Sequence, residues 1–375
     1  MTAWHPDLKP GARVAVGLSG GVDSSMSAWL LQRAGCEVIG LTMAIWDDTI
    51  PMPDEGRSGC FGPGEARDLE AAAAFAARLG IAHHVIPLAE EYRRTVLDYF
   101  RAEYLAGRTP NPCVRCNHRM KFGFLLERAR ALGLDFEFFA TGHYARVERD
   151  GGTGRWLLKR SRDRAKDQTY FLSHLGQEQL RTLVLPLGAL AKDEVKALAR
   201  EAGFPELAER PESQDFIESK DYAVLFAPGD ACPGPIADAE GRVLGEHRGL
   251  LHYTVGQRKG LGLGGAGEPL YVTALDAATN TVRVGRRAEL LHSRFRAEDL
   301  NWIALPGAPP APRRADCQIR QRHAAAPATL ERDGEDAVRV VFDQPQMSIT
   351  PGQTAAFYDG DTVLGAGRIE PGDGD

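Results

Sequence analysis

The stretch that decides the fold reads Arg13-Val14-Ala15-Val16-Gly17-Leu18-Ser19-Gly20-Gly21-Val22-Asp23-Ser24-Ser25, and Met26-Ser27-Ala28-Trp29-Leu30-Leu31 follows it. A short apolar run, a Gly-Gly turn and a helical pattern predict a buried parallel strand that leads through a tight turn into a helix. Glycines let backbone N–H groups approach an anion, and a helix N-terminus adds about half a positive charge. The sequence therefore predicts a phosphate-binding turn at residues 19–25.

Strand-like and helix-like segments alternate through the first half of the chain. We predict strands at 37–43, 83–88 and 136–140, and helices at 65–79, 89–106 and 117–132. This alternation predicts an α/β domain with a parallel sheet and right-handed crossovers. Ligands of such sheets bind beyond the carboxyl ends of the strands. The phosphate-binding turn, the segment after Met43 and the run Thr141-Gly142-His143 all fall at such ends.

The second half of the chain has a different composition. Glycine and proline become more frequent after about Pro211, and short strand-like pieces follow from about Arg294. The predicted strands at 315–320, 337–342, 354–358 and 362–366 indicate a small antiparallel β-barrel.

Bulk properties narrow the class of protein. The chain has 375 residues, a net charge of −6 and six cysteines. It begins without a secretory signal pattern, and it contains no apolar run long enough to span a membrane. Six cysteines in a chain of this length do not indicate a secreted disulfide framework, so we expect a cytoplasmic protein with no membrane partner.

Two local groups of basic residues stand out against the negative net charge, and clustering matters more than the total for binding nucleic acid. They are Arg155, Lys159, Arg160, Arg162, Arg164 and Lys166, and Arg313, Arg314, Arg320, Arg322 and His323. Contacts from these groups to phosphates would make RNA binding depend on salt.

The turn Ser-Gly-Gly-Val-Asp-Ser-Ser resembles the pyrophosphate (PP) loop of enzymes that split ATP into AMP and pyrophosphate. Together with other motifs along nearly the whole chain, this turn resembles the family of tRNA-uridine 2-sulfurtransferases, the tRNA-specific 2-thiouridylases. These motifs are Thr109-Pro110-Asn111-Pro112, Cys116-Asn117, Ala140-Thr141-Gly142-His143-Tyr144, Lys166-Asp167-Gln168-Thr169-Tyr170-Phe171, Gly256-Gln257-Arg258-Lys259-Gly260-Leu261 and Thr350-Pro351-Gly352-Gln353. The resemblance implies a PP-loop ATP-binding domain of the adenine-nucleotide alpha-hydrolase type at 1–215, a small central tRNA-binding domain at 216–293 and a C-terminal β-barrel at 294–375.

The resemblance also implies an activity. ATP would adenylate the 2-carbonyl oxygen of the wobble uridine, in the anticodon region of tRNA, and a sulfur nucleophile would then displace AMP. Asp23 would take part in catalysis, and Mg²⁺ would screen the phosphates. The implied ATP-binding residues are Gly17, Leu18, Ser19, Gly20, Gly21, Val22, Asp23, Ser24, Met43 and Gly142.

Further positions match family residues that contact tRNA. Asn111, Pro112 and Cys113 match positions near the target base, which must leave its stack before its carbonyl can be reached. The other implied contacts to tRNA are His143, Lys166, Asp167, Gln168, Arg320, Gln321 and Gln353.

Cys116 aligns with the family nucleophile. A thiolate is the reactive form and needs a positive setting, for which Arg115, His118 and Arg119 are the adjacent candidates. Many family members carry a second cysteine that receives a persulfide, but the corresponding run Glu212-Ser213-Gln214-Asp215-Phe216-Ile217 has none. Cys232 is the nearest cysteine downstream.

Three routes for sulfur therefore stay open. Cys60, Cys113 and Cys116 would hold a [4Fe-4S] cluster with one open iron, or Cys113 and Cys116 would carry and resolve a persulfide as a dithiol, or Cys232 would act as a distant partner. The sulfur donor is a cysteine desulfurase, a sulfur-relay protein or free sulfide. Two other functions compete: an amide-forming ligase with the same ATP loop, and an RNA-binding protein that has lost catalysis.

Overall fold

A computed structural model describes residues 4–54, 56, 58–210, 215–264 and 268–371. The chain divides into two compact units. The first unit consists of Met1–Thr95, Cys113–Lys220 and Asp361–Leu364, and the second unit consists of Val96–Pro112, Asp221–Gly360 and Gly365–Asp375.

The first unit is built on a parallel sheet with the strand order β4-β2-β1-β5-β8, which confirms the predicted fold class. The strands are β1 (Arg13–Gly17), β2 (Glu37–Ala44), β4 (Ala82–Pro87), β5 (Phe138–Ala140) and β8 (Leu183–Val184). The chain adds strands on one side of β1 and later on the other. The connections that follow β1 and β5 therefore lead away from each other, and the crevice between such connections is the usual ligand site of this sheet type.

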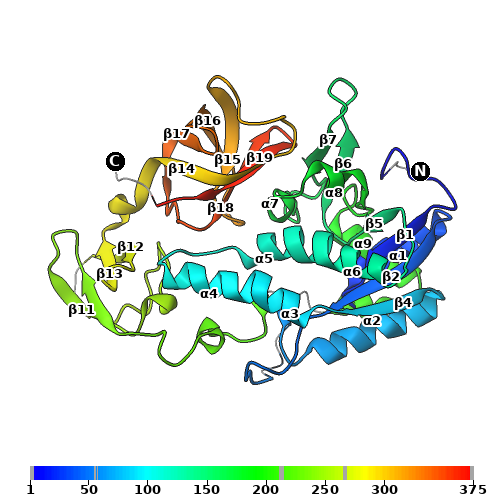
Figure 1. The fold of residues 1–375 in the computed structure, drawn as a ribbon, viewed down its shortest axis with the longest axis horizontal. Coiled ribbons are helices and arrows are strands. Elements are labelled where there is room, and N and C mark those ends of the chain that lie inside the picture. The colour runs from blue at the N-terminus through cyan, green and yellow to red at the C-terminus, as the bar shows by residue number, and fades with distance from the viewer. Residues whose placement is uncertain (1–3, 55, 57, 211–214, 265–267, 372–375) are drawn as a thin grey trace. The chain divides into compact units, whose positions relative to one another are not determined.

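Helices cover both faces of this sheet (Figure 1). On one face α1 (Val22–Arg33), α2 (Glu65–Leu79) and α9 (Lys192–Glu201) share a core with Val14 and Val16 of β1. On the other face Phe122 meets Phe139 of β5 edge-on, with 5.5 Å between ring centroids. Because side chains alternate along a strand, the apolar run of β1 supplies both cores.

The helical run before β5 differs from its prediction. It begins at Pro112 rather than at residue 117, and it consists of α5 (Pro112–Arg115), the π-helix η2 (Cys116–Phe124) and α6 (Leu125–Ala131). Proline suits the first position of a helix because its missing N–H would have no helical partner there. Cys113 and Cys116 therefore lie inside the helical run, not in a loop before it.

The predicted helix at 89–106 is also interrupted by a π-helical segment. It consists of α3 (Ala89–Tyr92), η1 (Arg93–Leu97) and α4 (Asp98–Leu105). Hydrophobic spacing does not distinguish an α-helix from a helix with a π-helical insertion, so both insertions escaped prediction.

Shorter elements complete the first unit. They are β3 (Gly59–Phe61), β6 (Ala145–Arg149), β7 (Trp156–Arg160), α7 (Thr169–Leu172), α8 (Gln177–Arg181), α10 (Pro205–Glu209) and β9 (Asp215–Ile217). The strands β6 and β7 form an antiparallel hairpin, and β3 pairs in parallel with β9.

The second unit contains a four-stranded sheet and a β-barrel. The sheet has the order β11-β10-β13-β12, from β10 (Gly234–Ala237), β11 (Val243–His247), β12 (Tyr271–Asp276) and β13 (Thr281–Gly285). Single helical turns lie at η3 (Tyr222–Leu225), η4 (Leu250–His252) and η5 (Arg287–Leu290). The core of the four-stranded sheet includes Ile236, Val272 and Val282.

The barrel confirms the antiparallel architecture predicted for the C-terminal part. Its strands are β14 (Leu291–Trp302), β15 (Arg313–Gln318), β16 (Ala326–Arg332), β17 (Val338–Met347), β18 (Thr354–Asp359) and β19 (Thr362–Ile369). Pairing between β14 and β19 closes it. The sequence missed β14 and β16, whose polar and small residues weaken the strand pattern. Among the helices of the described residues, none is both long and apolar enough to cross a membrane.

Candidate active site

The phosphate-binding turn connects β1 to α1. Gly20 has a φ of +73°, and a Cβ atom there would lie 3.0 Å from both the Arg210 guanidinium and the backbone oxygen of Asp68. Glycine is therefore required at this position on two counts. Gly21 is the N-cap of α1 and has no side chain to occupy the N–H groups of the first turn. An anion would find those donors available.

Two serines behave differently in this turn. The Ser24 hydroxyl donates to the Gly21 carbonyl at 3.1 Å and accepts from the Ser19 N–H at 3.1 Å, so it fixes the bend. The Ser25 hydroxyl is buried and has no hydrogen-bond partner among the described residues. A buried hydroxyl without a partner is uncommon and calls for an explanation. Together with the glycine N-cap, this hydroxyl fits the binding of a nucleotide's phosphates.

Asp23, predicted to act in catalysis, is held in an internal ion pair. Lys192 Nζ lies 2.8 and 2.7 Å from its two carboxylate oxygens, and the Tyr144 hydroxyl donates to Oδ1 at 2.8 Å. The Lys192 side chain is only 8% exposed. Asp23 thus holds a buried cation beside a turn that contains no lysine of its own. Lys192 was not predicted as a site residue, because it lies 169 residues from Asp23 and no local motif marks it.

The remaining predicted ATP-binding residues gather around the ends of β1, β2 and β5. The Leu18 N–H donates to the Leu41 carbonyl at 2.8 Å, which ties the turn to β2 two residues before Met43. A Cβ atom on Gly142 would lie 2.6 Å from the backbone of Asp23. The segment after β5 therefore packs directly against the start of α1.

Three free thiols and one lysine form a second group of residues. Cys60 on β3 is exposed, and Cys113 and Cys116 are partly exposed. Desolvation raises the pKa of all three thiols, that of Cys116 to about 11, and Lys121 acts in the opposite direction on each. Burial lowers the pKa of Lys121, but the three thiols raise it by more. We call Cys60, Cys113 and Cys116 the thiol triad.

Lys121 is thus a positive neighbour of Cys116. A role for the predicted candidates Arg115, His118 and Arg119 stays a prediction. The π-helix explains the position of Lys121. In an α-helix, at about 100° per residue, positions 116 and 121 would lie about 140° apart around the axis. A π-helix joins residue i to residue i+5, so it brings position 121 back toward the side of position 116. Gln179 supports this widened turn by donating to the carbonyls of His118 and Phe122 at 3.0 and 2.9 Å.

His143 connects the thiol triad to the phosphate-binding turn. Burial, and to a smaller extent Lys121, lower the pKa of His143 to about 3, so the ring is neutral near pH 7. Its Nδ1 lies 2.8 Å from the Thr141 hydroxyl. Gly142, the preceding residue, packs against Asp23. The turn, His143 and the Lys121–Cys116 pair therefore belong to the same edge of the sheet.

The predicted iron–sulfur site gains no support from this geometry. Across the described ranges, no three His, Cys, Asp or Glu side chains are arranged to hold a metal ion. Cys232 lies in the second unit. Glu212, Ser213 and Gln214 lie outside the described residues, while Asp215 to Ile217 form β9.

Comparison with known proteins now adds to the geometry. Family models match three consecutive parts of the chain: a tRNA methyl transferase HUP domain at 12–218, a tRNA methyl transferase PRC-barrel domain at 227–286 and an aminomethyltransferase β-barrel domain at 292–369. The tRNA-specific 2-thiouridylase MnmA of Symbiobacterium thermophilum is 48% identical over 96% of this chain and 92% of its own. The proteins of the same name from Endomicrobium trichonymphae and Carboxydothermus hydrogenoformans are 44% and 45% identical, over 95% and 96% of this chain and 98% and 97% of their own.

The chain belongs to the tRNA-specific 2-thiouridylase family.

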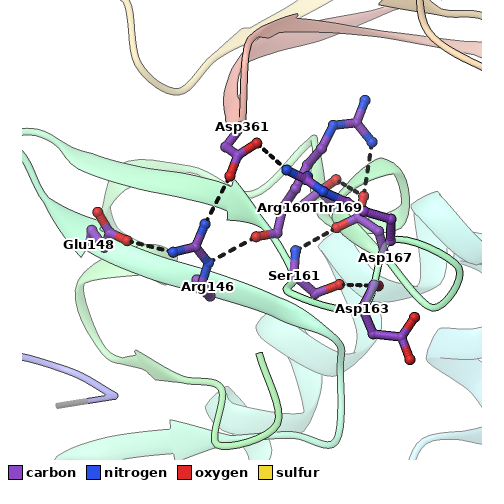
Figure 2. Close-up of polar contacts among 9 residues, drawn as sticks. Arg146, Glu148, Arg160, Ser161, Asp163, Asp167, Thr169 and Asp361 are labelled. Carbon is purple, nitrogen blue, oxygen red and sulfur yellow. Dashed lines mark hydrogen bonds and ion pairs between the residues drawn. The ribbon is translucent and has the colours of Figure 1, made fainter. Parts of the chain in front are cut away.

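Within this thiouridylase fold, two of the predicted tRNA contacts are engaged inside the chain. Asp167 accepts hydrogen bonds from the Ser161 N–H at 2.8 Å and the Thr169 hydroxyl at 2.6 Å, and it pairs with Arg160 at 3.1 Å (Figure 2). The Gln168 amide oxygen accepts from the Tyr144 N–H at 2.8 Å. Both residues therefore fix the segment that carries Lys166.

The first basic group of the thiouridylase chain is also largely paired. Arg164 of this group pairs with Asp361, which also binds Arg146 from outside the group, and Figure 2 shows the Arg146 contact. Lys159 pairs with Glu148 at 2.6 Å and Arg162 with Glu194 at 3.0 Å. An RNA phosphate at these side chains would compete with a carboxylate.

In the second unit, Gln353 holds the motif that leads to the cysteines. Its amide donates to the carbonyls of Thr109 and Pro110 at 2.9 and 3.1 Å. Arg320 donates to the Met347 carbonyl at 3.0 Å, and Gln321 is exposed. Asn111 is half-buried and Pro112 is buried. Contact of these residues with tRNA stays a prediction.

Proposed function

We propose that this chain uses ATP to replace the 2-oxygen of the wobble uridine of tRNA with sulfur. Membership of the thiouridylase family supports the reaction. The observations that support the proposal are a helix start capped by glycine directly after β1 and a Cys116 thiol on which the charge of Lys121 acts. The proposed substrates are cytoplasmic, so we assign the activity to that compartment.

Different residues of the site serve different steps of the proposed reaction. The N-terminus of α1, the Ser25 hydroxyl and Lys192 hold the phosphates of ATP. Magnesium, which prefers oxygen ligands, would bind to phosphate oxygens, because the Asp23 carboxylate is already held by Lys192 and Tyr144. The uridine O2 attacks the α-phosphorus and pyrophosphate leaves. The outer sulfur of a Cys116 persulfide then attacks C2, and the former O2 departs with AMP. The Cys113 thiolate attacks the Cys116 sulfur, so that the S–S bond breaks, the outer sulfur stays on C2 and a Cys113–Cys116 disulfide forms. Sulfide reopens this disulfide to a Cys116 persulfide and a Cys113 thiol, or a thiol reductant returns both cysteines to thiols.

For the sulfur itself we propose a persulfide on Cys116, with Cys113 as its dithiol partner. The two lie three residues apart in one helical run, so they share a side of the helix. We derive no step through an iron–sulfur cluster, because the thiol triad is not arranged as a metal site. Assays for iron and labile sulfide after anaerobic purification test this choice, and stoichiometric amounts of both would favour the cluster.

The test of function uses the full chain with its Cys113–Cys116 disulfide formed, together with ATP, Mg²⁺, sulfide and unmodified tRNA. Sulfide then opens the disulfide and leaves the persulfide on Cys116. We expect tRNA-dependent release of pyrophosphate and formation of 2-thiouridine, detected by nucleoside mass spectrometry. Cys116→Ser should form no product while it still binds ATP. Pyrophosphate release without tRNA would favour an amide-forming ligase, and binding of tRNA without pyrophosphate release would favour an RNA-binding protein that has lost catalysis.

A further inference from the structure

We propose that Cys60 is the entry site for sulfur: it accepts the outer sulfur atom of a donor persulfide and passes it to Cys116. The substrate class is a protein persulfide, R–S–S⁻. This inference rests on the proposed function, because Cys116 is the residue that delivers the sulfur to uridine.

The strand β3 presents Cys60 away from the core. Side chains alternate along a strand, and the next residue, Phe61, is buried. Its ring stacks on Tyr92 at 5.4 Å and contacts Trp46 edge-on at 4.8 Å. Because Phe61 is anchored inward, the Cys60 side chain points to the opposite face of the strand.

The backbone on both sides of Cys60 is held in place. Gly59 pairs with Asp215 and Phe61 pairs with Ile217 across the β3–β9 ladder. A Cβ atom on Gly59 would lie 2.5 Å from the backbone of Ile217, so the two strands approach closely. Cys60 is thus displayed by a fixed strand and not by a loose loop.

The fold brings the strand of Cys60 to the helical run of Cys116. Phe61, the neighbour of Cys60, stacks on Tyr92 of α3, and α3 packs against η2, which carries Cys116 and Lys121. The Lys121 ammonium interacts with all three members of the thiol triad. Burial, followed by the charges of Cys116, Cys60 and Cys113, raises the pKa of Tyr92 well above its ordinary value. Tyr92 is the residue whose ring stacks on Phe61. One cation and one phenol are therefore common neighbours of the entry thiol and the delivering thiol.

The difference in exposure among the cysteines indicates which thiol receives the sulfur first. A donor protein must bring its own cysteine to the receiving sulfur, and Cys60 is exposed whereas Cys113 and Cys116 are partly exposed. Cys36 and Cys317 are buried, and the exposed Cys232 belongs to the second unit. Within the described part of the first unit, Cys60 is the exposed free cysteine.

The relay consists of two thiolate exchanges and needs no oxidant or reductant. In the first, the Cys60 thiolate attacks the outer sulfur of the donor persulfide, the donor S–S bond breaks, and the donor cysteine leaves as a thiolate. In the second, the Cys116 thiolate attacks the outer sulfur of the Cys60 persulfide, and Cys60 leaves as a thiolate. Each step forms one S–S bond and breaks one. The positive charge of Lys121 acts on both Cys60 and Cys116, so it can balance the negative charge in both steps.

The experiment compares two sulfur sources in the full chain. One is a cysteine desulfurase with L-cysteine and a thiol reductant, which supplies a protein persulfide. The other is inorganic sulfide, which opens the Cys113–Cys116 disulfide of the proposed function directly to the Cys116 persulfide and needs no exchange with an exposed thiol. We expect Cys60→Ser to lower the rate of 2-thiouridine formation about tenfold or more with the desulfurase, and to leave the sulfide-driven rate within about twofold. Cys232→Ser is the matched control, an exposed cysteine whose loss should change neither rate.

A second readout detects the sulfur directly. In Cys116→Ser the relay stops after its first step, so alkylation and peptide mass spectrometry should find an additional sulfur atom on Cys60 after incubation with the desulfurase. Equal rates for Cys60→Ser and the parent chain with both sources would overturn the proposal. So would a desulfurase-specific loss in Cys113→Ser or Cys232→Ser instead, or a loss in Cys60→Ser with both sources. The absence of any sulfide-driven thiolation by the parent chain would count against the proposed function, not against the relay alone.

Discussion

The phosphate-binding turn and the thiol triad share one edge of the sheet but are built in opposite ways. The turn comes from consecutive residues, and its own serines and glycines fix its shape through hydrogen bonds. The triad comes from three elements, β3, α5 and η2, which the fold brings together around Lys121. A turn of this kind is specified locally, whereas the triad depends on distant strand pairing and on an unusual helix.

The same contrast appears in their charges. The turn relies on donors already in place, namely the free N-terminus of α1 and the buried Lys192. In the triad, desolvation raises the pKa of every thiol and Lys121 opposes it only in part, so Cys116 is mainly a thiol at neutral pH. The turn is therefore ready for its ligand, while the thiols need a partner to become reactive.

The largest effect that we expect in either region follows from the loss of Lys192. Lys192→Met removes the buried cation beside the turn, and we expect kcat/KM for ATP to fall about 100-fold, or about 3 kcal/mol. The measurement is tRNA-dependent release of pyrophosphate at varied ATP. Cys116 should keep its alkylation rate, because the triad has its own cation.

This variant also leaves Asp23 without its ion-pair partner, which destabilises a protein. The double variant Asp23→Asn, Lys192→Met removes both charges and separates the two effects. If the double variant recovers thermal stability but not the use of ATP, Lys192 serves the nucleotide. Recovery of both would show that the pair is only structural and that the turn does not depend on a buried cation.

The contrast also explains what could be predicted from the sequence. The strand, the glycines and the helix start of the turn were predicted in order, because each has a signal within a few residues. Lys192 was not predicted to belong to the site, since it lies in the first turn of an ordinary amphipathic helix. No local sequence pattern indicates that a residue will form an ion pair with a carboxylate 169 positions away.

The thiol triad illustrates a second limit on what can be predicted from the sequence. Cys60, Cys113 and Cys116 were named together, but only the β3–β9 pairing fixes where Cys60 lies, and that ladder joins segments more than 150 residues apart. Lys121 was not predicted as a charged neighbour, because the candidates were taken from the residues next to Cys116 in sequence. The signal for the π-helix is a single glutamine, Gln179, in a different helix.

A smaller effect, confined to the triad, follows from the loss of Lys121. A nearby cation favours the thiolate, so Lys121→Met should raise the pKa of Cys116 further above its value of about 11. At any pH below that value the thiolate fraction falls, and we expect alkylation of Cys116 at pH 8 to slow about tenfold. The rate of the parent chain should rise with pH toward about 11, and the curve of the variant should be displaced to higher pH.

Peptide mass spectrometry follows Cys116 separately from the other thiols in this measurement. Arg119→Gln is the control, because it removes an exposed cation from the same π-helix. Equal pH profiles for Lys121→Met and the parent chain would show that Lys121 does not control Cys116. A displacement caused by Arg119→Gln would show that Arg119, a candidate from the sequence, also acts on Cys116.

The smallest effect tests the π-helix itself. The Gln179 side chain donates to the carbonyls of His118 and Phe122 and accepts from the Gly176 N–H at 2.9 Å. Gln179→Met keeps the size of the side chain but loses these bonds, which should cost about 1–3 kcal/mol of unfolding free energy. Gln177→Met is the matched control, because Gln177 makes a comparable pair of bonds to Trp156 of β7 instead. Thermal unfolding should show similar losses of stability for the two variants. Only Gln179→Met should also slow the alkylation of Cys116, because only that variant removes the bonds that hold the π-helix and thereby lets Lys121 move away from Cys116.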